Sequence, residues 1–262
     1  MTNRLLLDAV RDVARLMGER ALRYFRSGVT VETKADGSEV TAADRETERL
    51  GREWIERRFP GESILGEEYG SYPGSAERRW LIDPIDGTRS FVRGVPLWGS
   101  MVAVEQDNTV LAGAICCPAT GDLVAAAAGE GCWHNDTRAQ VSKVSDLMDA
   151  VILATDARFP ANPERVSRWT ALVSEVATAR TWGDCYGYVL VATGRAELMV
   201  DDRLSPWDVT PLVPIITEAG GVFTDWRGRR EPGPDGVATN ASLARVLRDR
   251  LGVPLVSRGG LP

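Results

Sequence analysis

Acidic residues that could hold a metal ion occur at three separate places in this sequence. Glu67 and Glu68 end one apolar run, Asp83 and Asp86 flank a Pro-Ile pair after the next, and Asp208 opens an apolar segment far downstream. Clustered carboxylates repel one another, so a folded protein tolerates them together only with cations between them. Because neither histidine nor cysteine accompanies them, these oxygen ligands select a hard ion such as Mg²⁺, with Mn²⁺ as an alternative.

Two such ions that share one carboxylate could support phosphoryl chemistry. They can polarise a phosphoryl oxygen, lower the pKa of a bound water and stabilise the leaving oxygen. The shared carboxylate must lie between the ions, and Asp83 is the candidate. The acidic pattern therefore predicts a metal-dependent phosphate ester hydrolase.

The run Asp86-Gly87-Thr88 suggests a phosphate-binding turn. Gly87 lacks a Cβ, so backbone N–H groups can approach an anion, and a helix starting near Thr88 would direct its free N–H groups at the phosphate. The Thr88 hydroxyl could orient the attacking water while Asp44 takes its proton. Each role has a structural alternative: Thr88 could be a simple helix N-cap, and Asp44 could form a capping box with Thr41.

The overall charge and the histidine count exclude several classes of function. The net charge of −6 gives no basic surface for nucleic acid or an anionic membrane. His134 is the only histidine, which excludes a zinc site built from several histidines, and we expect it in an exposed loop within the turn-like run 131–136. A small phosphorylated molecule is the expected partner.

The cysteines and the N-terminus indicate a cytoplasmic protein. Cys116, Cys117, Cys132 and Cys185 have no metal-ligand spacing, which favours buried free thiols in a reducing compartment. The apolar residues near the N-terminus recur at helical spacing, unlike those of a signal peptide. No apolar stretch is long enough to span a membrane.

The hydropathy pattern predicts an α+β protein in two parts. Residues 1–145 would form an α+β lobe with the metal and phosphate site, and 146–262 an α/β lobe with substrate-selecting residues. The run 98–132 is typical of an antiparallel meander, and 28–40 of a loop or short hairpin. We expect helices over 4–26, from 41 to 59, 163–176, 186–192, 208–219 and 242–251, and strands over 63–68, 79–82, 151–154, 196–200 and 222–226.

Several segments together resemble the inositol monophosphatase superfamily. They are Gly66-Glu67-Glu68, the run from Trp80 to Thr88 that reads Trp-Leu-Ile-Asp-Pro-Ile-Asp-Gly-Thr, Trp207-Asp208, and Glu218-Ala-Gly-Gly221. Their order and spacing match over nearly the whole chain. The resemblance implies a layered αβαβα sandwich of the inositol monophosphatase and sugar phosphatase type, a homodimer, and hydrolysis of phosphate monoesters by direct attack of water.

The resemblance also implies individual roles. Glu67, Asp83 and the Ile85 carbonyl would hold one Mg²⁺, while Asp83, Asp86 and Asp208 would hold a second. Glu67 would help to hold a third ion through water. Thr88 and Asp44 would activate the attacking water, and the Gly87 and Thr88 amides would bind phosphate. Lys34 falls in a loop that in this family closes over the site.

The substrate must be argued from the segment before Trp207. Gly183-Asp184-Cys185-Tyr186 resembles the histidinol-phosphate phosphatases of this superfamily, whereas the inositol phosphatases usually carry Gly-Ser/Thr-Ala-Ala there. Asp184 and Asp201 would pair with a cationic substrate. An N-cap role for Asp184 and a role for Asp202 in place of Asp201 stay open. The residues expected to bind substrate are Asp86, Gly87, Thr88, Gly183, Asp184, Asp201 and Asp208.

Three functions follow, in this order. The first is hydrolysis of L-histidinol phosphate in histidine biosynthesis. The second is an inositol-1-phosphatase or a sugar phosphatase of broad specificity. The third, from a different class, is a binding or regulatory protein with a phosphatase fold. The five acids argue against it, because a purely structural role gives no reason to keep repelling charges together.

Overall fold

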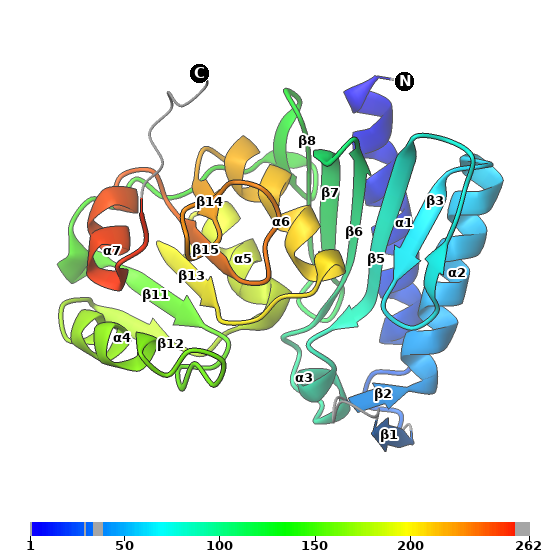
Figure 1. Cartoon of the computed structure of the whole chain (residues 1–262). Helices are drawn as coiled ribbons and strands as arrows, with labels where there is room; N and C mark the ends of the chain where they lie inside the picture. Colours follow the sequence, from blue (N-terminus) through cyan, green and yellow to red (C-terminus); the bar gives the residue numbers. More distant parts are fainter. Residues whose placement is uncertain (1, 29, 34–38, 255–262) are drawn as a thin grey trace.

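A computed structural model of the chain describes residues 2–28, 30–33 and 39–254. It consists of five layers, helices alternating with sheets (Figure 1). The expected αβαβα sandwich is therefore confirmed. Lys34 lies outside the described residues. In the described part of the chain, no helix combines the length and apolar character needed to cross a membrane.

The first three layers run from the N-terminal helices to the centre of the molecule. Helices α1 (Asn3–Leu22) and α2 (Ala42–Arg58) cover one face of an eight-stranded sheet ordered β10-β9-β8-β7-β6-β5-β3-β4. Helices α5 (Asp184–Ala192) and α6 (Pro206–Glu218) form the middle layer. The strands are β3 (Ser63–Gly66), β4 (Gly70–Tyr72), β5 (Arg78–Asp86), β6 (Gly99–Gln106), β7 (Thr109–Cys117), β8 (Asp122–Ala127), β9 (Gly131–His134) and β10 (Thr137–Arg138).

The remaining layers complete the sandwich. A five-stranded mixed sheet, ordered β12-β11-β13-β15-β14, lies between the middle helices and the outer pair α4 (Arg165–Val173) and α7 (Ala244–Leu251). Smaller elements are the β1–β2 hairpin (Val31–Thr33, Glu39–Thr41), the short helix α3 (Thr88–Val92) and a 3₁₀ turn at Leu147–Asp149. The sheet contains β11 (Val151–Ala154), β12 (Thr178–Arg180), β13 (Leu198–Asp201), β14 (Val222–Thr224) and β15 (Gly236–Thr239).

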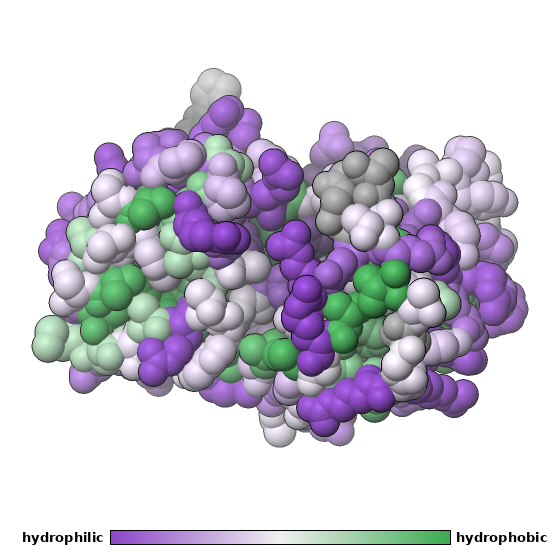
Figure 2. Space-filling view, turned by 90° about the horizontal axis from the view of Figure 1, so that it is seen from below, coloured by the Kyte–Doolittle hydropathy of each residue, from purple (hydrophilic) through white to green (hydrophobic). Residues whose placement is uncertain are grey.

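Strands covered on both faces explain the long apolar runs of the sequence. Along β5 and β6, Ile82 and Val102 pack with α1, whereas Met101 packs with the middle helices, because successive side chains point to opposite faces. All of β8 is buried for the same reason. On the face seen from below, hydrophobic residues gather in separate patches among hydrophilic ones (Figure 2).

Helix α6 joins the two sheets. Its buried residues Leu212 and Ile216 belong to one core with Ile115 of the large sheet and with Met199 and Phe223 of the small one. The division of the chain into lobes at residue 145 stays a prediction, since this helix from the second half packs on the sheet of the first.

Most expected elements are present, with shifted ends. Helix α1 stops at Leu22 rather than at residue 26, and Arg26 adopts a positive φ of 61°, which a helix cannot contain. Strand β5 continues past Ile82 to Asp86, through Pro84. The short strands β12 and β15 were not expected; β15 follows a segment rich in proline and glycine that hides its pattern.

Gly113 sets the distance between β7 and α6. A Cβ at this position would lie 2.6 Å from the Pro211 carbonyl oxygen and 2.7 Å from its Cα. Such overpacking of a buried contact costs about 1–3 kcal/mol. We therefore expect Gly113→Ala to lower the free energy of unfolding by that amount in urea titrations. Thr109→Ala, at the exposed start of the same strand, should change it by no more than about 0.5 kcal/mol. Equal effects of the two would contradict this account.

Candidate active site

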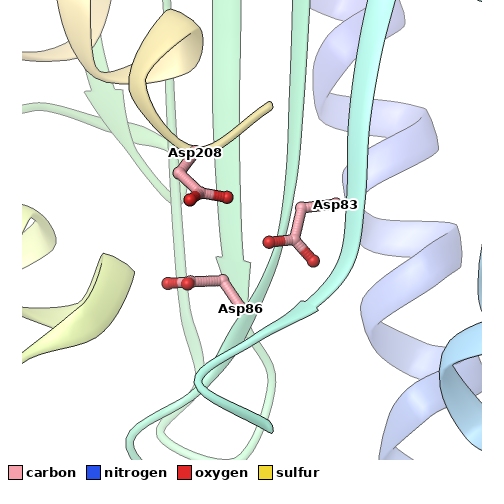
Figure 3. A group of neighbouring side chains, drawn as sticks. All are labelled: Asp83, Asp86 and Asp208. Carbon is pink, nitrogen blue, oxygen red and sulfur yellow. The ribbon is translucent and has the colours of Figure 1, made fainter. Parts of the chain in front are cut away.

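Three aspartates converge between β5 and the start of α6 (Figure 3). Asp83 and Asp86 come from the end of β5, and Asp208 from the first turn of α6. One carboxylate oxygen from each lies within 4.8 Å of those of the other two. The structure thus brings together three predicted metal ligands that are separated by up to 125 positions in the sequence, counted from 83 to 208.

A bulge in β5 makes this convergence possible. In a regular strand, side chains three residues apart point to opposite faces of the sheet. The pairing register with β6 shifts between Asp83 and Asp86, so an irregular turn replaces the normal alternation. Pro84 lies inside this bulge, where its missing N–H breaks no regular ladder bond. Both carboxylates can therefore lie close to that of Asp208.

Backbone groups fix each carboxylate in place. The three N–H donors come from different elements: Ile85 to Asp83 at 2.9 Å, Cys185 to Asp86, and Ser205 to Asp208 at 2.8 Å. The last contact belongs to a capping box at the start of α6, where the helix dipole also favours a negative charge.

The cluster is electrostatically strained without a cation. Burial raises the pKa of Asp83 well above its usual value, and the charges of Glu67 and Asp208 add to the effect. Burial and the Asp208 charge raise the pKa of Asp86 to about 7. Burial, opposed by the Ser205 N–H, raises the pKa of Asp208 to about 7. The donors are all oxygen atoms, so the cluster could hold a hard divalent cation, which would relieve the repulsion.

A buried glutamate holds the turn that carries Glu67. Glu48 of α2 has no exposed surface, and its carboxylate accepts the backbone N–H groups of Glu68 at 2.6 Å and Tyr69 at 3.1 Å. A Cβ on Gly66 would lie 2.1 Å from a Glu48 oxygen, so glycine allows the backbone to pack this closely against the Glu48 side chain. Sequence reasoning missed Glu48. Its spacing of four residues from Asp44, on one face of α2, was the available signal.

Asp44 forms the expected capping box with one of its carboxylate oxygens, and the other oxygen takes no part in the cap. Its Oδ2 accepts the N–H of Thr41 at 2.8 Å and the Thr41 hydroxyl at 2.7 Å. Its Oδ1 is buried and has no hydrogen-bond partner among the described residues. Burial raises the pKa of Asp44, the Thr41 bonds oppose this, and the Glu67 charge adds to it. The cap and the predicted role as a base therefore use different oxygens.

The turn predicted to bind phosphate has the expected backbone but a different cap. Gly87, with a φ of 82°, is the N-cap residue of α3, so the alternative role of Thr88 as N-cap is wrong. The Thr88 hydroxyl instead donates to the Ile85 carbonyl at 2.9 Å. A Cβ on Gly87 would lie 3.0 Å from the Leu97 carbonyl and 3.1 Å from an Asp184 oxygen. The turn therefore packs directly against the predicted substrate-selecting acid.

Two cavities have Asp184 in their walls. The smaller, of about 190 Å³, is lined by four acids, Asp86, Asp184, Asp201 and Asp208, together with Tyr188. The larger, of about 610 Å³, is lined by Glu67, Gly87, Thr88, Gly183 and Arg89 among others. The predicted substrate-binding residues are thus divided between these two spaces.

Asp184 and Asp201 both line the smaller cavity. Asp184 is the first residue of α5 after the N-cap Gly183 and makes no cap bond, so its alternative role as N-cap is wrong. Burial and the Asp86 charge raise its pKa to about 7, while Arg89 opposes them. Asp201 is buried and lines the smaller cavity. The neighbouring Asp202 pairs with Arg165 at 2.8 Å instead, which favours Asp201 over Asp202.

Other conspicuous residues have structural positions. His134 ends strand β9 rather than lying in a loop, and its Nε2 is 2.7 Å from Asp122 Oδ1, so that expectation was wrong. Glu218 accepts the N–H groups of Gly129 and Gly131, both at 2.9 Å, and so supports a turn. The four cysteines are free and buried, as expected.

Comparison with known proteins gives concordant results. Residues 3–252 match the model of the inositol monophosphatase family. A histidinol-phosphatase of Chlorobaculum parvum is 39% identical, over 94% of this chain and 96% of that protein. An inositol-1-monophosphatase of Mesorhizobium japonicum is 30% identical, over 98% of this chain and 100% of that protein. The crystal structure of the extragenic suppressor protein suhB from Bartonella henselae has a TM-score of 0.87 at 26% identity, covering 98% of this chain and 100% of that one.

The acid cluster predicts how pH and a cation affect stability. The folded pKa values of about 7 for Asp86 and Asp208 exceed the unfolded value of about 3.9, so folding retains protons. The stability that these groups contribute is complete below the unfolded pKa and is lost as pH rises through the folded pKa. We expect the melting temperature of the metal-free protein to fall from pH 5 to pH 8. At one fixed concentration, about 100 times its Kd at pH 8, Mg²⁺ should add about 2.7 kcal/mol to the free energy of unfolding at pH 8. The same concentration should add less at pH 5, where protonated carboxyls bind the ion more weakly.

Asp208→Asn provides the control for this experiment. Removing one of the repelling charges should flatten the pH dependence of the metal-free protein and reduce its stabilisation by Mg²⁺. Stabilisation by Mg²⁺ that is equal at both pH values, or unchanged in the variant, would show that this cluster does not bind the ion.

Proposed function

The chain belongs to the inositol monophosphatase family and is a phosphoric monoester hydrolase, and on this premise we propose that its substrate is L-histidinol phosphate, with L-histidinol and inorganic phosphate as products. The similarity to the histidinol-phosphatase of Chlorobaculum parvum supports this choice of ester. A cytoplasmic homodimer is the form in which we expect the enzyme to work.

The acid-lined smaller cavity is the observation that carries the proposal. Asp184 and Asp201 face it in addition to the two predicted metal ligands Asp86 and Asp208. Histidinol carries an ammonium and a protonatable imidazole, which would offset these charges, whereas an inositol offers only hydroxyl groups. Burial raises the pKa of Asp184 to about 7 and that of Asp201 well above its usual value, so a cationic leaving group would stabilise the ionised form of both acids.

Mg²⁺ is the proposed cofactor. Glu67, Asp83, Asp86, Asp208 and the Ile85 carbonyl would hold it, as two or three ions. When bound, the ions would supply positive charge that offsets the carboxylates, polarises the phosphoryl group and lowers the pKa of a water.

Asp44 and Thr88 are the proposed pair for activating water. The Oδ1 of Asp44 is buried with no hydrogen-bond partner in the described part of the chain, and burial raises the pKa of this carboxyl, which makes it a stronger base. Thr88 shares the larger cavity with Glu67, the residue whose charge reaches Asp44. Thr88 would orient the water, and Asp44 would take its proton.

The start of α3 would bind the phosphate. Gly87 turns the chain in the left-handed region, so that its own N–H and that of Thr88 can approach an anion. Both residues line the larger cavity. The phosphate would therefore sit in the larger cavity, with the leaving group in the smaller one.

An inositol-1-phosphatase is the second candidate. The relative from Mesorhizobium japonicum, named an inositol-1-monophosphatase, aligns with nearly the whole chain. Carboxylates such as Asp86 and Asp201 can accept hydrogen bonds from sugar hydroxyls as well as from cations. A sugar phosphatase of broad specificity is compatible with the same site.

Phosphate release with Mg²⁺ from L-histidinol phosphate and from inositol-1-phosphate separates these candidates. We expect the larger kcat/KM with L-histidinol phosphate. Asp83→Asn should abolish phosphate release from both esters, because it replaces one carboxylate of the cluster with an uncharged amide. Equal or faster turnover of inositol-1-phosphate would refute the proposed substrate, and an active Asp83→Asn enzyme would refute the metal site.

The charge of Asp184 should discriminate between the esters. Asp184→Asn keeps the size of the side chain and removes the charge that pairs with a cation. We expect it to lower kcat/KM for both esters unequally. Expressed as a free energy of activation, the loss should be about 2 kcal/mol larger for L-histidinol phosphate than for inositol-1-phosphate. Asp156→Asn is a matched control, since Asp156 lines only the larger cavity and pairs with Arg158. A similar loss with both esters would show that Asp184 does not select for charge.

A further inference from the structure

Thr155 occupies a special place between the two cavities. It directly follows β11, at the end of the strand nearest the start of α5. It lines both the smaller, acid-lined cavity and the larger cavity of the phosphate-binding turn, as Asp184 does. Thr155 lies outside all of the sequence motifs that predict the site.

The first contact of Thr155 fixes the backbone of Asp184. Its Oγ1 accepts the Asp184 N–H at 2.8 Å. A Cβ on Gly183 would lie 2.4 Å from the Thr155 Cα and 2.6 Å from its Oγ1, so glycine is required for the two segments to approach this closely. Asp184 itself adopts a positive φ of 51°, which non-glycine residues keep only when their surroundings impose it.

The second contact of Thr155 reaches Asp201. A hydroxyl carries one proton and two lone pairs, so the oxygen that accepts the Asp184 N–H can still donate its own proton. Asp201 lines the smaller cavity together with Thr155. Burial raises the pKa of the Asp201 carboxyl well above its usual value, and hydrogen bonding to the hydroxyls of Thr155 and Tyr188 opposes this effect. One side chain thus contacts both acids, which belong to α5 and β13.

We propose that Thr155 is a positioning residue that sets the selectivity for cationic phosphate esters, because its single hydroxyl holds the Asp184 backbone and also contacts the Asp201 carboxyl in the wall of the smaller cavity. This inference rests on the proposed function, since it assumes that the two acids pair with a cationic leaving group. In the described part of the chain no hydrogen bond joins the Thr155 hydroxyl to Asp83, Asp86, Asp208 or Gly87, so its loss should change the choice of ester more than the chemistry.

Thr155→Val provides the direct test, since valine has nearly the same shape and lacks the hydroxyl. The ratio of kcat/KM for L-histidinol phosphate to that for inositol-1-phosphate should fall by about tenfold, the effect of a lost hydrogen bond to a charged group. Stabilisation of the protein by Mg²⁺ should not change. Thr155→Ser, which keeps the hydroxyl, should restore the ratio to within about threefold of the wild type.

Two further variants complete the design. Thr155→Ala tests the same loss should the valine variant fail to fold, since it adds no bulk against Gly183. Thr217→Val is the control for exchanging threonine with valine, because its hydroxyl bonds only to helix carbonyls at the exposed end of α6. The control should keep the wild-type ratio.

The outcomes distinguish failure of the proposed function from failure of the role proposed for Thr155. A wild-type enzyme with no preference for L-histidinol phosphate refutes the proposed function, and this inference with it. A wild-type preference that survives in folded Thr155→Val or Thr155→Ala refutes the inference alone. Equal loss of both esters, or a serine variant as unselective as the valine variant, also overturns it, since the hydroxyl would not be the determinant.

Discussion

Repulsion between carboxylates is the constraint to which the rest of this site responds. Asp83, Asp86 and Asp208 lie close enough for burial and mutual charge to raise all three pKa values. Freely moving side chains would separate, so each is held by a backbone N–H from a strand bulge or a helix start. The folded protein therefore stores an unfavourable arrangement that a cation can relieve, and packing elsewhere must supply the energy to maintain it.

The five layers supply this rigidity by placing α5 and α6 between two sheets. Asp208 and Asp184 begin these two middle helices, while Asp83 and Asp86 end a strand of the large sheet. The core around Leu212 joins residues of both sheets, so the helix starts cannot shift without disturbing both. A site assembled at the junction of three layers gains precise placement from packing, although the residues are far apart in the sequence.

The sequence predicted what depends on local order and missed what depends on distant contacts. The segment from Asp83 to Thr88 revealed the acids and the glycine turn, because its residue types are unusual at that spacing. The bulge at Pro84 could not be foreseen, since it is defined by register with β6. In the sequence, Glu48 is one more acid on an amphipathic helix, and its role in holding the turn after Gly66 depends on contacts with a distant segment.

In the proposed function, selectivity and reaction chemistry would be carried by different elements that touch at one point. The proposed metal ligands and phosphate-binding turn lie on β5 and at Gly87, whereas the acids that would bind the charged group of the substrate belong to α5 and β13. Asp184 nevertheless lies against Gly87, and the charge of Asp86 raises its pKa. A cation that neutralises Asp184 would lower the repulsion on Asp86, and one that offsets Asp86 would favour ionised Asp184. Binding of metal and binding of a cationic leaving group should therefore be coupled, because both act on the same pair of carboxylates.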